Sequence, residues 1–286
     1  MRKFINRSIK IYLISLIVIL IFNKNILAQE KYEVADDPIS INYDIIKVHD
    51  YNAIIWGFEF IDEKTIIFTD KKGKIFILKN DKIQEISEVP EIYLMGQGGL
   101  MDIELHPKFD QNNKVFLSFA ESSNKSDGGN TAIMSAILDQ NKLINKKIIY
   151  RGKENSKKGQ HWGSRIQFDK DGFLFFTIGD RGNRNINPQD LSRDGGKVYR
   201  INEDGSIPED NPFVDKNNVI EAIYSYGHRN PQGIFLHPES GMIWTNEHGP
   251  KGGDEINIIR KGKNYGWPTI TYGKNYNGTT ITNLRK

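Results

Sequence analysis

Residues 166–177 read Ile-Gln-Phe-Asp-Lys-Asp-Gly-Phe-Leu-Phe-Phe-Thr (IQFDKDGFLFFT). An apolar–polar–apolar triplet is followed by a polar Asp-Lys-Asp-Gly turn and by a mostly aromatic run that ends in threonine. Alternation of this kind is typical of a β-strand, and Asp and Gly supply the turn chemistry that joins two antiparallel strands. The segment therefore predicts a β-hairpin.

The same hairpin pattern occurs four times along the chain. The other three copies occupy residues 58–69, 103–118 and 234–245. The first copy continues into a further apolar segment, residues 75–78, which predicts a third strand. The equivalent apolar positions are Phe60, Leu105, Phe168 and Leu236. Sheet-sized units repeated at such intervals, with almost no helical periodicity, favour a β-propeller. A two-sheet sandwich is the alternative all-β fold, but it does not require the same hairpin four times.

The composition excludes several classes of function. The chain has 286 residues and no cysteine, which excludes disulfides, zinc–thiolate sites, iron–sulfur clusters and a cysteine nucleophile. The formal net charge is +3, but residues 1–28 hold five basic side chains and no acidic one, so the remainder is close to −2. No basic region for nucleic acid is therefore expected. A nicotinamide site is also not indicated, because no G-x-G-x-x-G follows a strand and opens a helix.

Residues 1–28 predict a secretory signal peptide. Four positive charges in residues 1–10 precede an apolar run at 11–22, and Ala28 is a small residue at a plausible cleavage point. A retained membrane anchor is the alternative, although roughly 20 apolar residues are needed to cross a bilayer. In either case we expect the folded domain, residues 29–286, to be periplasmic or secreted.

Polar motifs recur at the same place relative to the predicted hairpins. Gln97 precedes the second, His161 precedes the third, and the Arg229-Asn230 pair opens the fourth. Equivalent ends of successive blades meet at one face of a propeller, so these side chains are expected to converge there. Taken singly, each is also consistent with a residue that only satisfies loop hydrogen bonds. Residues 179–218, rich in Gly, Asn, Asp and Pro, predict a long loop of the kind that holds a site.

Several segments together resemble the soluble pyrroloquinoline-quinone (PQQ)-dependent sugar dehydrogenases, the glucose/sorbosone dehydrogenase family. The resemblance covers roughly residues 50–275 and rests on these segments: GQGGLMDIELHPKF (96–109), QHWGSRIQFDKDGFLFFTIGDRG (160–182), GGKVYRINEDGSIPEDNPF (195–213), YGHRNPQG (226–233) and EHGPKGGDEINIIRKGKNYGWP (247–268). The aldose sugar dehydrogenase branch looks closer than the dimeric glucose enzyme, because His248 stands where the latter has glutamine.

The resemblance implies a six-bladed propeller that binds PQQ and calcium. His161 would match the general base and Gln97 a cofactor contact, while Arg229 and Asn230 would match the pair that touches the quinone. The implied metal ligands are the carbonyls of Gly249 and Pro250 for the calcium beside PQQ, and Glu255 and the Tyr265 carbonyl for a second, structural calcium. An aldose would be oxidised to its lactone, with electrons passed to an external acceptor.

Two further expectations follow from the repeat count. Residues 269–286 end within what should be a further blade, so we expect a ring of about four blades here and the missing blades C-terminal to it. Open sheet edges favour aggregation, and we expect this form to be inactive. The alternative function is a non-catalytic propeller that binds a sugar or a protein on the same face.

Overall fold

The computed structural model describes residues 43–122 and 124–284. The chain divides into two units, Met1–Lys47 and Val48–Lys286, and the second contains all the described strands. The predicted signal peptide lies outside the described residues. Within those residues, no helix has the length and apolar character needed to cross a membrane.

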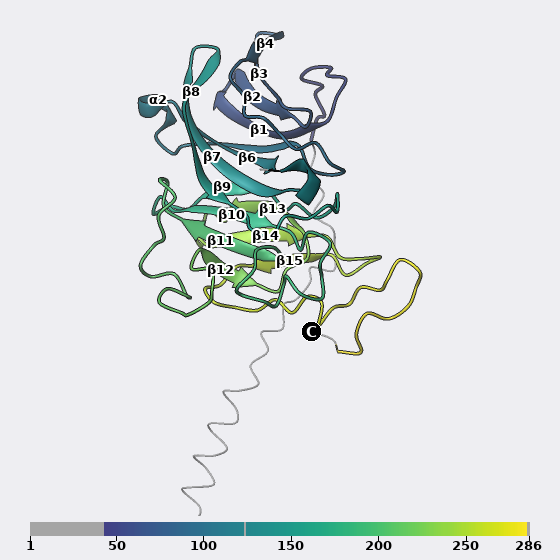
Figure 1. Cartoon of the computed structure of the whole chain (residues 1–286). Helices are drawn as coiled ribbons and strands as arrows, with labels where there is room; N and C mark the ends of the chain where they lie inside the picture. The colour runs from purple at the N-terminus through teal and green to yellow at the C-terminus, as the bar shows by residue number, and fades with distance from the viewer. Residues whose placement is uncertain (1–42, 123, 285–286) are drawn as a thin grey trace, which may run out of the picture. The chain divides into compact units, whose positions relative to one another are not determined.

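The described part of Val48–Lys286 contains four antiparallel sheets, each a meander whose neighbouring strands follow one another in sequence (Figure 1). The first consists of β1 (Ile55–Asp62), β2 (Thr65–Asp70), β3 (Lys74–Lys79) and β4 (Lys82–Ile86). The second consists of β5 (Leu100–Leu105), β6 (Lys114–Glu121), β7 (Asn130–Asp139) and β8 (Lys142–Arg151). The third consists of β9 (Ile166–Phe168), β10 (Leu174–Ile178), β11 (Lys197–Ile201) and β12 (Ile223–Tyr226). The fourth consists of β13 (Pro231–Leu236), β14 (Ile243–Glu247) and β15 (Glu255–Ile258). The described helices are the short α2 (Phe109–Asn112) and the 3-10 turn η1 (Lys125–Asp127). The predicted all-β, propeller-like arrangement of about four blades is confirmed.

All four predicted hairpins are present, as β1–β2, β5–β6, β9–β10 and β13–β14. In the third, Leu174 lies opposite Phe168 and Phe176 lies opposite Ile166. The turn between them is closed by Asp169, whose carboxylate accepts the backbone N–H groups of Asp171 and Phe173. This is the side-chain-to-backbone bonding expected of an Asp that begins a turn. The predicted third strand of the first copy is β3.

The prediction of a single long loop over residues 179–218 is wrong at Lys197–Ile201, because these residues form β11. All five residues of β11 are buried, although its sequence KVYRI contains two cations. Arg200 is satisfied by Asn211 and Asp210, and Lys197 by backbone carbonyls. Lysine and arginine are rarely buried without partners, so a segment that contains both is not expected to form a buried strand. This is why the sequence pattern did not indicate β11.

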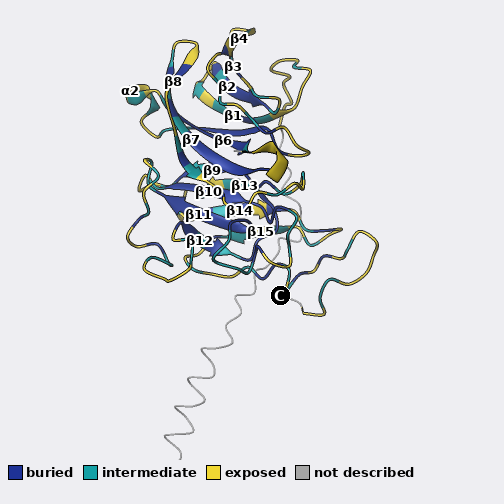
Figure 2. Cartoon of the chain, viewed as in Figure 1, coloured by how far each residue is buried: buried dark blue, intermediate teal, exposed yellow. Residues whose placement is uncertain are grey.

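The blades pack through apolar layers that follow from the two-residue period of a strand. Leu117 of β6 packs toward the first blade, whereas the adjacent Phe116 packs toward the third. In β10, Phe176 faces the second blade while Phe175 packs with Ile243 of the fourth. Figure 2 shows that the central strands of the second and third sheets are buried. Because both faces of a middle blade are covered, its strands are apolar at successive positions.

Carboxylates join the first strands of neighbouring blades. Asp102 of β5 accepts hydrogen bonds from the Arg165 guanidinium at 2.7 Å and from the backbone N–H of Ile166 at 2.9 Å. Glu104 accepts one from the Gln167 amide at 3.1 Å. Burial, together with the charges of Glu59 and Asp102, raises the pKa of Glu104 to about 9, and Glu59 is hydrogen-bonded to it. Burial also raises the pKa of Glu59, to about 7, so the hydrogen-bonded Glu59–Glu104 pair holds a proton at neutral pH.

We predict that Glu104→Gln flattens the pH dependence of stability. The Glu104 carboxyl binds its proton more tightly in the folded chain than in the unfolded chain, where its pKa is about 4.3. The free energy of unfolding of the wild type should therefore fall as the pH rises from that value towards 9, by about 1 kcal/mol per pH unit. Urea denaturation at pH 6 and 8 measures this. An equal fall in the variant would contradict the assignment of the proton to Glu104.

Candidate active site

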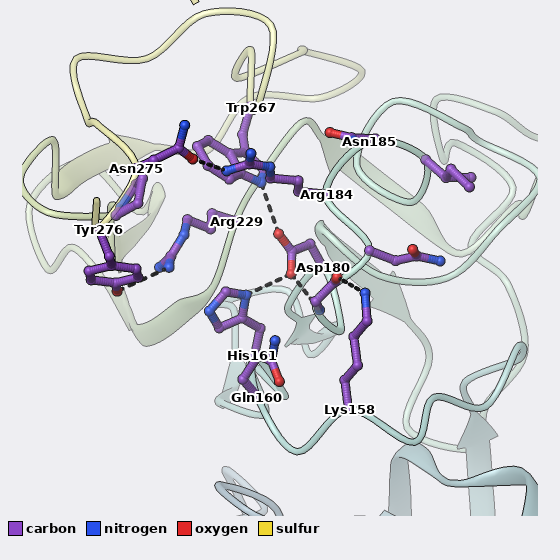
Figure 3. Close-up of a pocket in the computed structure, with 14 residues that line it drawn as sticks. Lys158, Gln160, His161, Asp180, Arg184, Asn185, Arg229, Trp267, Asn275 and Tyr276 are labelled. Carbon is purple, nitrogen blue, oxygen red and sulfur yellow. Dashed lines mark hydrogen bonds and ion pairs between the residues drawn. The ribbon is translucent and has the colours of Figure 1, made fainter. Parts of the chain in front are cut away.

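One pocket of about 400 Å³ collects residues from loops of the third and fourth blades (Figure 3). Its wall includes Gln160 and His161 before β9, Asp180 and residues 182–186 after β10, and Arg229 before β13. Pro250, Trp267, Asn275 and Tyr276 complete it from the C-terminal part of the chain. The structure thus brings together three predicted site residues, His161, Arg229 and Pro250.

His161 has a backbone conformation that is uncommon for a residue other than glycine, with φ = +58°. Two contacts hold it there: its N–H donates to the side-chain carbonyl of Gln97 at 2.8 Å, and its carbonyl accepts the N–H of Arg181 at 3.3 Å. Gly179 is required beside it, because a Cβ there would lie 2.5 Å from the His161 carbonyl oxygen. The loop therefore presents this imidazole in one orientation.

The imidazole is oriented by a buried carboxylate. His161 Nδ1 lies 2.7 Å from Oδ1 of Asp180, whose side chain is only 1% exposed. The other carboxylate oxygen accepts the indole N–H of Trp267 at 2.9 Å. An acceptor at this distance places the imidazole proton on Nδ1. Nε2 is then left as a proton acceptor on the pocket side of the ring.

Three cations line the pocket against a single carboxylate, that of Asp180. Among the described residues, none of the three forms an ion pair. Lys158 donates to the carbonyl of Gly182, Arg184 donates to the Asn275 side chain at 2.8 Å, and Arg229 donates to the His248 carbonyl at 2.8 Å. Neutral partners leave these positive charges uncompensated, so the pocket favours an anionic ligand.

A buried pair below the pocket fixes Arg229. His228 is fully buried, and its Nδ1 lies 2.7 Å from Glu247. The second oxygen of Glu247 accepts the backbone N–H of Arg229 at 2.9 Å. The guanidinium then lies 5.6 Å from the ring centre of Trp267, within the range of a cation–π contact. Arg229 and Trp267 thus form one wall (Figure 3).

Gln97 and Asn230, the other predicted cofactor contacts, do not line this pocket. Gln97 holds the His161 backbone, as described above. Asn230 is buried, and its side-chain carbonyl accepts the N–H of Gly163 at 3.0 Å. In the structure both side chains support the loop that carries His161.

The predicted calcium ligands lie in two places. Pro250 is at the pocket wall, and the N–H of Gly249 donates to Asp254. Glu255 lines a separate hollow beside Glu247, His248 and Asp254. For Tyr265 the predicted ligand is the backbone carbonyl; the hydroxyl of this residue donates to the carbonyl of Ile258 at 2.5 Å, and its ring stacks on His228. Among the described residues, no group of three or more His, Asp or Glu side chains could hold a metal ion.

Sequence reasoning did not single out several pocket residues, namely Lys158, Asp180, Arg184, Trp267, Asn275 and Tyr276. Asp180 and Trp267 lie inside segments already quoted, Ile178-Gly-Asp-Arg-Gly182 and Asn264-Tyr-Gly-Trp-Pro268. An acid directly after a buried strand, within the same blade as His161, is the signal that could have identified Asp180.

Known proteins resemble this chain along most of its described length. The aldose sugar dehydrogenase YliI of Escherichia coli is 37% identical over 248 residues, covering 85% of this chain and 66% of that protein. Quinoprotein glucose dehydrogenase B of Acinetobacter calcoaceticus is 32% identical, covering 81% and 53%. The solved PQQ-bound form of an aldose sugar dehydrogenase from Streptomyces coelicolor has a TM-score of 0.69 at 28% identity, covering 78% and 65%.

The chain spans less than two thirds of the length of the curated relatives just named. Residues 52–286 match the glucose/sorbosone dehydrogenase family, which is most of the chain. The blades and the polar loops between them lie within that match. The chain therefore belongs to the glucose/sorbosone dehydrogenase family.

Proposed function

We propose that the protein carrying this chain is a PQQ- and calcium-dependent dehydrogenase that oxidises an aldose at C1 to the lactone. The observation that carries the proposal is the His161–Asp180 pair in a pocket lined by uncompensated cations. A purely sugar-binding propeller has no need of a buried carboxylate that fixes the tautomer of an imidazole. The quinoprotein and PQQ-bound relatives support the cofactor assignment.

The chemistry of the pocket fits PQQ, which is a flat tricarboxylate with an ortho-quinone. Lys158, Arg184 and Arg229 supply three positive charges that have no carboxylate partner among residues 43–122 and 124–284. The indole of Trp267, held by Asp180 and beside Arg229, supplies a flat surface. Charge-assisted bonds from guanidinium groups to carboxylates are among the stronger hydrogen bonds in proteins.

For calcium, the chain offers oxygen donors, which this ion prefers. Pro250 stands at the pocket wall, and the carboxylate of Asp254 fixes the preceding Gly249. We propose that the Gly249 and Pro250 carbonyls hold the ion beside the cofactor. For the structural calcium we propose Glu255 and the Tyr265 carbonyl, as the resemblance implies.

In this proposal some residues of the chain bind the cofactor and others transfer the proton. Arg229 would bind the anionic cofactor, and Trp267 would orient its flat ring system. When bound, PQQ supplies an acceptor for the hydride that leaves C1, and calcium supplies positive charge beside it. His161 takes the proton of the C1 hydroxyl on Nε2, while Asp180 stabilises the imidazolium that results. The carbonyl of the lactone forms as the C–H and O–H bonds break.

We also propose export of the protein, on the basis of the charged and apolar pattern of residues 1–28. The reoxidation step would then use an acceptor outside the cytoplasm.

His161→Gln is predicted to lower turnover by about 10² or more, as expected for loss of a general base. PQQ should still bind, because the cations and Trp267 are retained. A dye-linked assay with a neutral aldose measures turnover, and PQQ fluorescence measures binding. His49→Gln, at an exposed position, is the control. Near-normal turnover in His161→Gln would remove this residue from the mechanism.

Arg229→Gln is predicted to weaken PQQ binding by about 10- to 100-fold, the value of one charge-assisted hydrogen bond. Excess PQQ should then restore part of the activity. Titration of the apo-protein with PQQ measures the effect, with Arg151→Gln on the surface as the matched control. If saturating PQQ restores nothing, Arg229 acts in the chemical step or in folding, contrary to this assignment.

A further inference from the structure

Lys197, the first residue of β11, is fully buried. Burying an ammonium group is costly unless it is well paired. Yet in the part of the chain that the structure describes, no carboxylate forms an ion pair with it. Groups other than carboxylates must therefore stabilise the Lys197 ammonium in this position.

The partners of Lys197 are three backbone carbonyls. Its Nζ donates to Asn187, to Asp190 at 2.8 Å and to Gly195 at 2.9 Å. An ammonium group has three N–H donors, so all of them are used. The three carbonyls belong to one segment, residues 187–195, which curls around the amine. We call this segment with its preceding residues, 182–196, the pocket loop.

The pocket loop is part of the proposed active site. Residues 182–186 line the pocket directly. Asn187, whose carbonyl binds Lys197, also donates from its side chain to the backbone carbonyl of Asp180 at 3.1 Å. Asp180 in turn holds Nδ1 of His161. A continuous set of hydrogen bonds thus runs from the buried amine to the imidazole.

We propose that Lys197 is a positioning residue that holds the pocket loop closed on itself and, through Asn187, fixes Asp180 and His161. The effect on cofactor binding rests on the proposed function, whereas the effect on the loop does not. Without the ammonium, three buried carbonyls would lose their donor, each at a cost of about 1–3 kcal/mol. The loop would then open to water to satisfy them.

Burial and the neighbouring carboxylates act in opposite directions on the charge of the Lys197 amine. Burial lowers the pKa of Lys197 to about 7, while Asp194, Asp190 and Glu154 act to raise it and Arg193 to lower it. Asp194 is itself engaged, by the Tyr150 hydroxyl at 2.6 Å and the N–H of Lys153 at 2.7 Å. The comparison below is therefore made at about pH 6, where the amine is charged.

The absence of cysteine permits a test that changes only the charge. Lys197→Cys provides a single thiol, which is alkylated in denaturant with 2-bromoethylamine or with 1-bromopropane. The two products have the same shape, but only the first ends in an ammonium group. After refolding, hydrogen exchange of the pocket loop should be at least about 10-fold faster in the propyl form. The aminoethyl form should match the wild type.

Binding of PQQ is the second readout. We expect it to be about 10-fold weaker in the propyl form than in the aminoethyl form, because the pocket wall is no longer fixed. If the wild type fails to bind PQQ, the proposed function fails, but the exchange comparison still tests the role of Lys197. Equal loop protection in the two alkylated forms would overturn the inference.

Directly expressed variants remove the dependence on refolding. Lys197→Gln keeps N–H donors and should protect the pocket loop better than Lys197→Met, while Lys216→Met, at an exposed position of the same blade, should behave as wild type. If Lys197→Met loses protection throughout the third blade rather than in the loop, or if it fails to fold, Lys197 serves general folding and the inference is wrong.

Discussion

The carboxylate of Asp180 connects its own loop with two other segments of the chain, those of His161 and Trp267. It accepts hydrogen bonds from the His161 ring at 2.7 Å, the Gly182 N–H at 2.7 Å and the Trp267 indole at 2.9 Å. All three donor residues line the pocket. Because the carboxylate is buried, these bonds are strong and any one left unmade would be costly. The orientation of the His161 imidazole depends on this one group.

The propeller architecture makes such a meeting possible. Each blade is a meander, so the loops before and after its first hairpin return to the same face. His161 precedes β9, Asp180 follows β10 and Arg229 precedes β13, and the apolar layers between blades keep these loops in register. The scaffold is rigid where it is apolar, while the polar loops are held by side-chain-to-backbone bonds such as that of Gln97 to His161.

The sequence predicted the four hairpins and the propeller because each hairpin is a local pattern of apolar period and turn residues. It did not predict β11, where Lys197 and Arg200 are buried inside the strand and hide that pattern. The repeat also predicted that His161 and Arg229 lie at the same face, because both stand just before a hairpin. It did not identify Asp180 or Trp267 as partners of that site, because their contacts bridge up to 87 residues and depend on how the loops fold back.

The resemblance to the sugar dehydrogenases named individual residues, and the structure gives several of them a different physical setting. Gln97 and Asn230 bond to the backbone of the His161 loop rather than line the pocket. The ring of Tyr265, whose carbonyl is the predicted ligand, stacks on His228. A binding site is thus built in two layers: groups that face the ligand, and groups that hold them in place.

The most direct test of this account is the protonation state of the His161 ring. Nitrogen-15 NMR of histidine-labelled protein distinguishes the two neutral tautomers, and His161→Gln identifies the signal among the six histidines. The account predicts that at pH 8 the proton of His161 is on Nδ1, with Nε2 unprotonated, and that Asp180→Asn abolishes this preference. A proton on Nε2 in the wild type would contradict the role of His161 as the base.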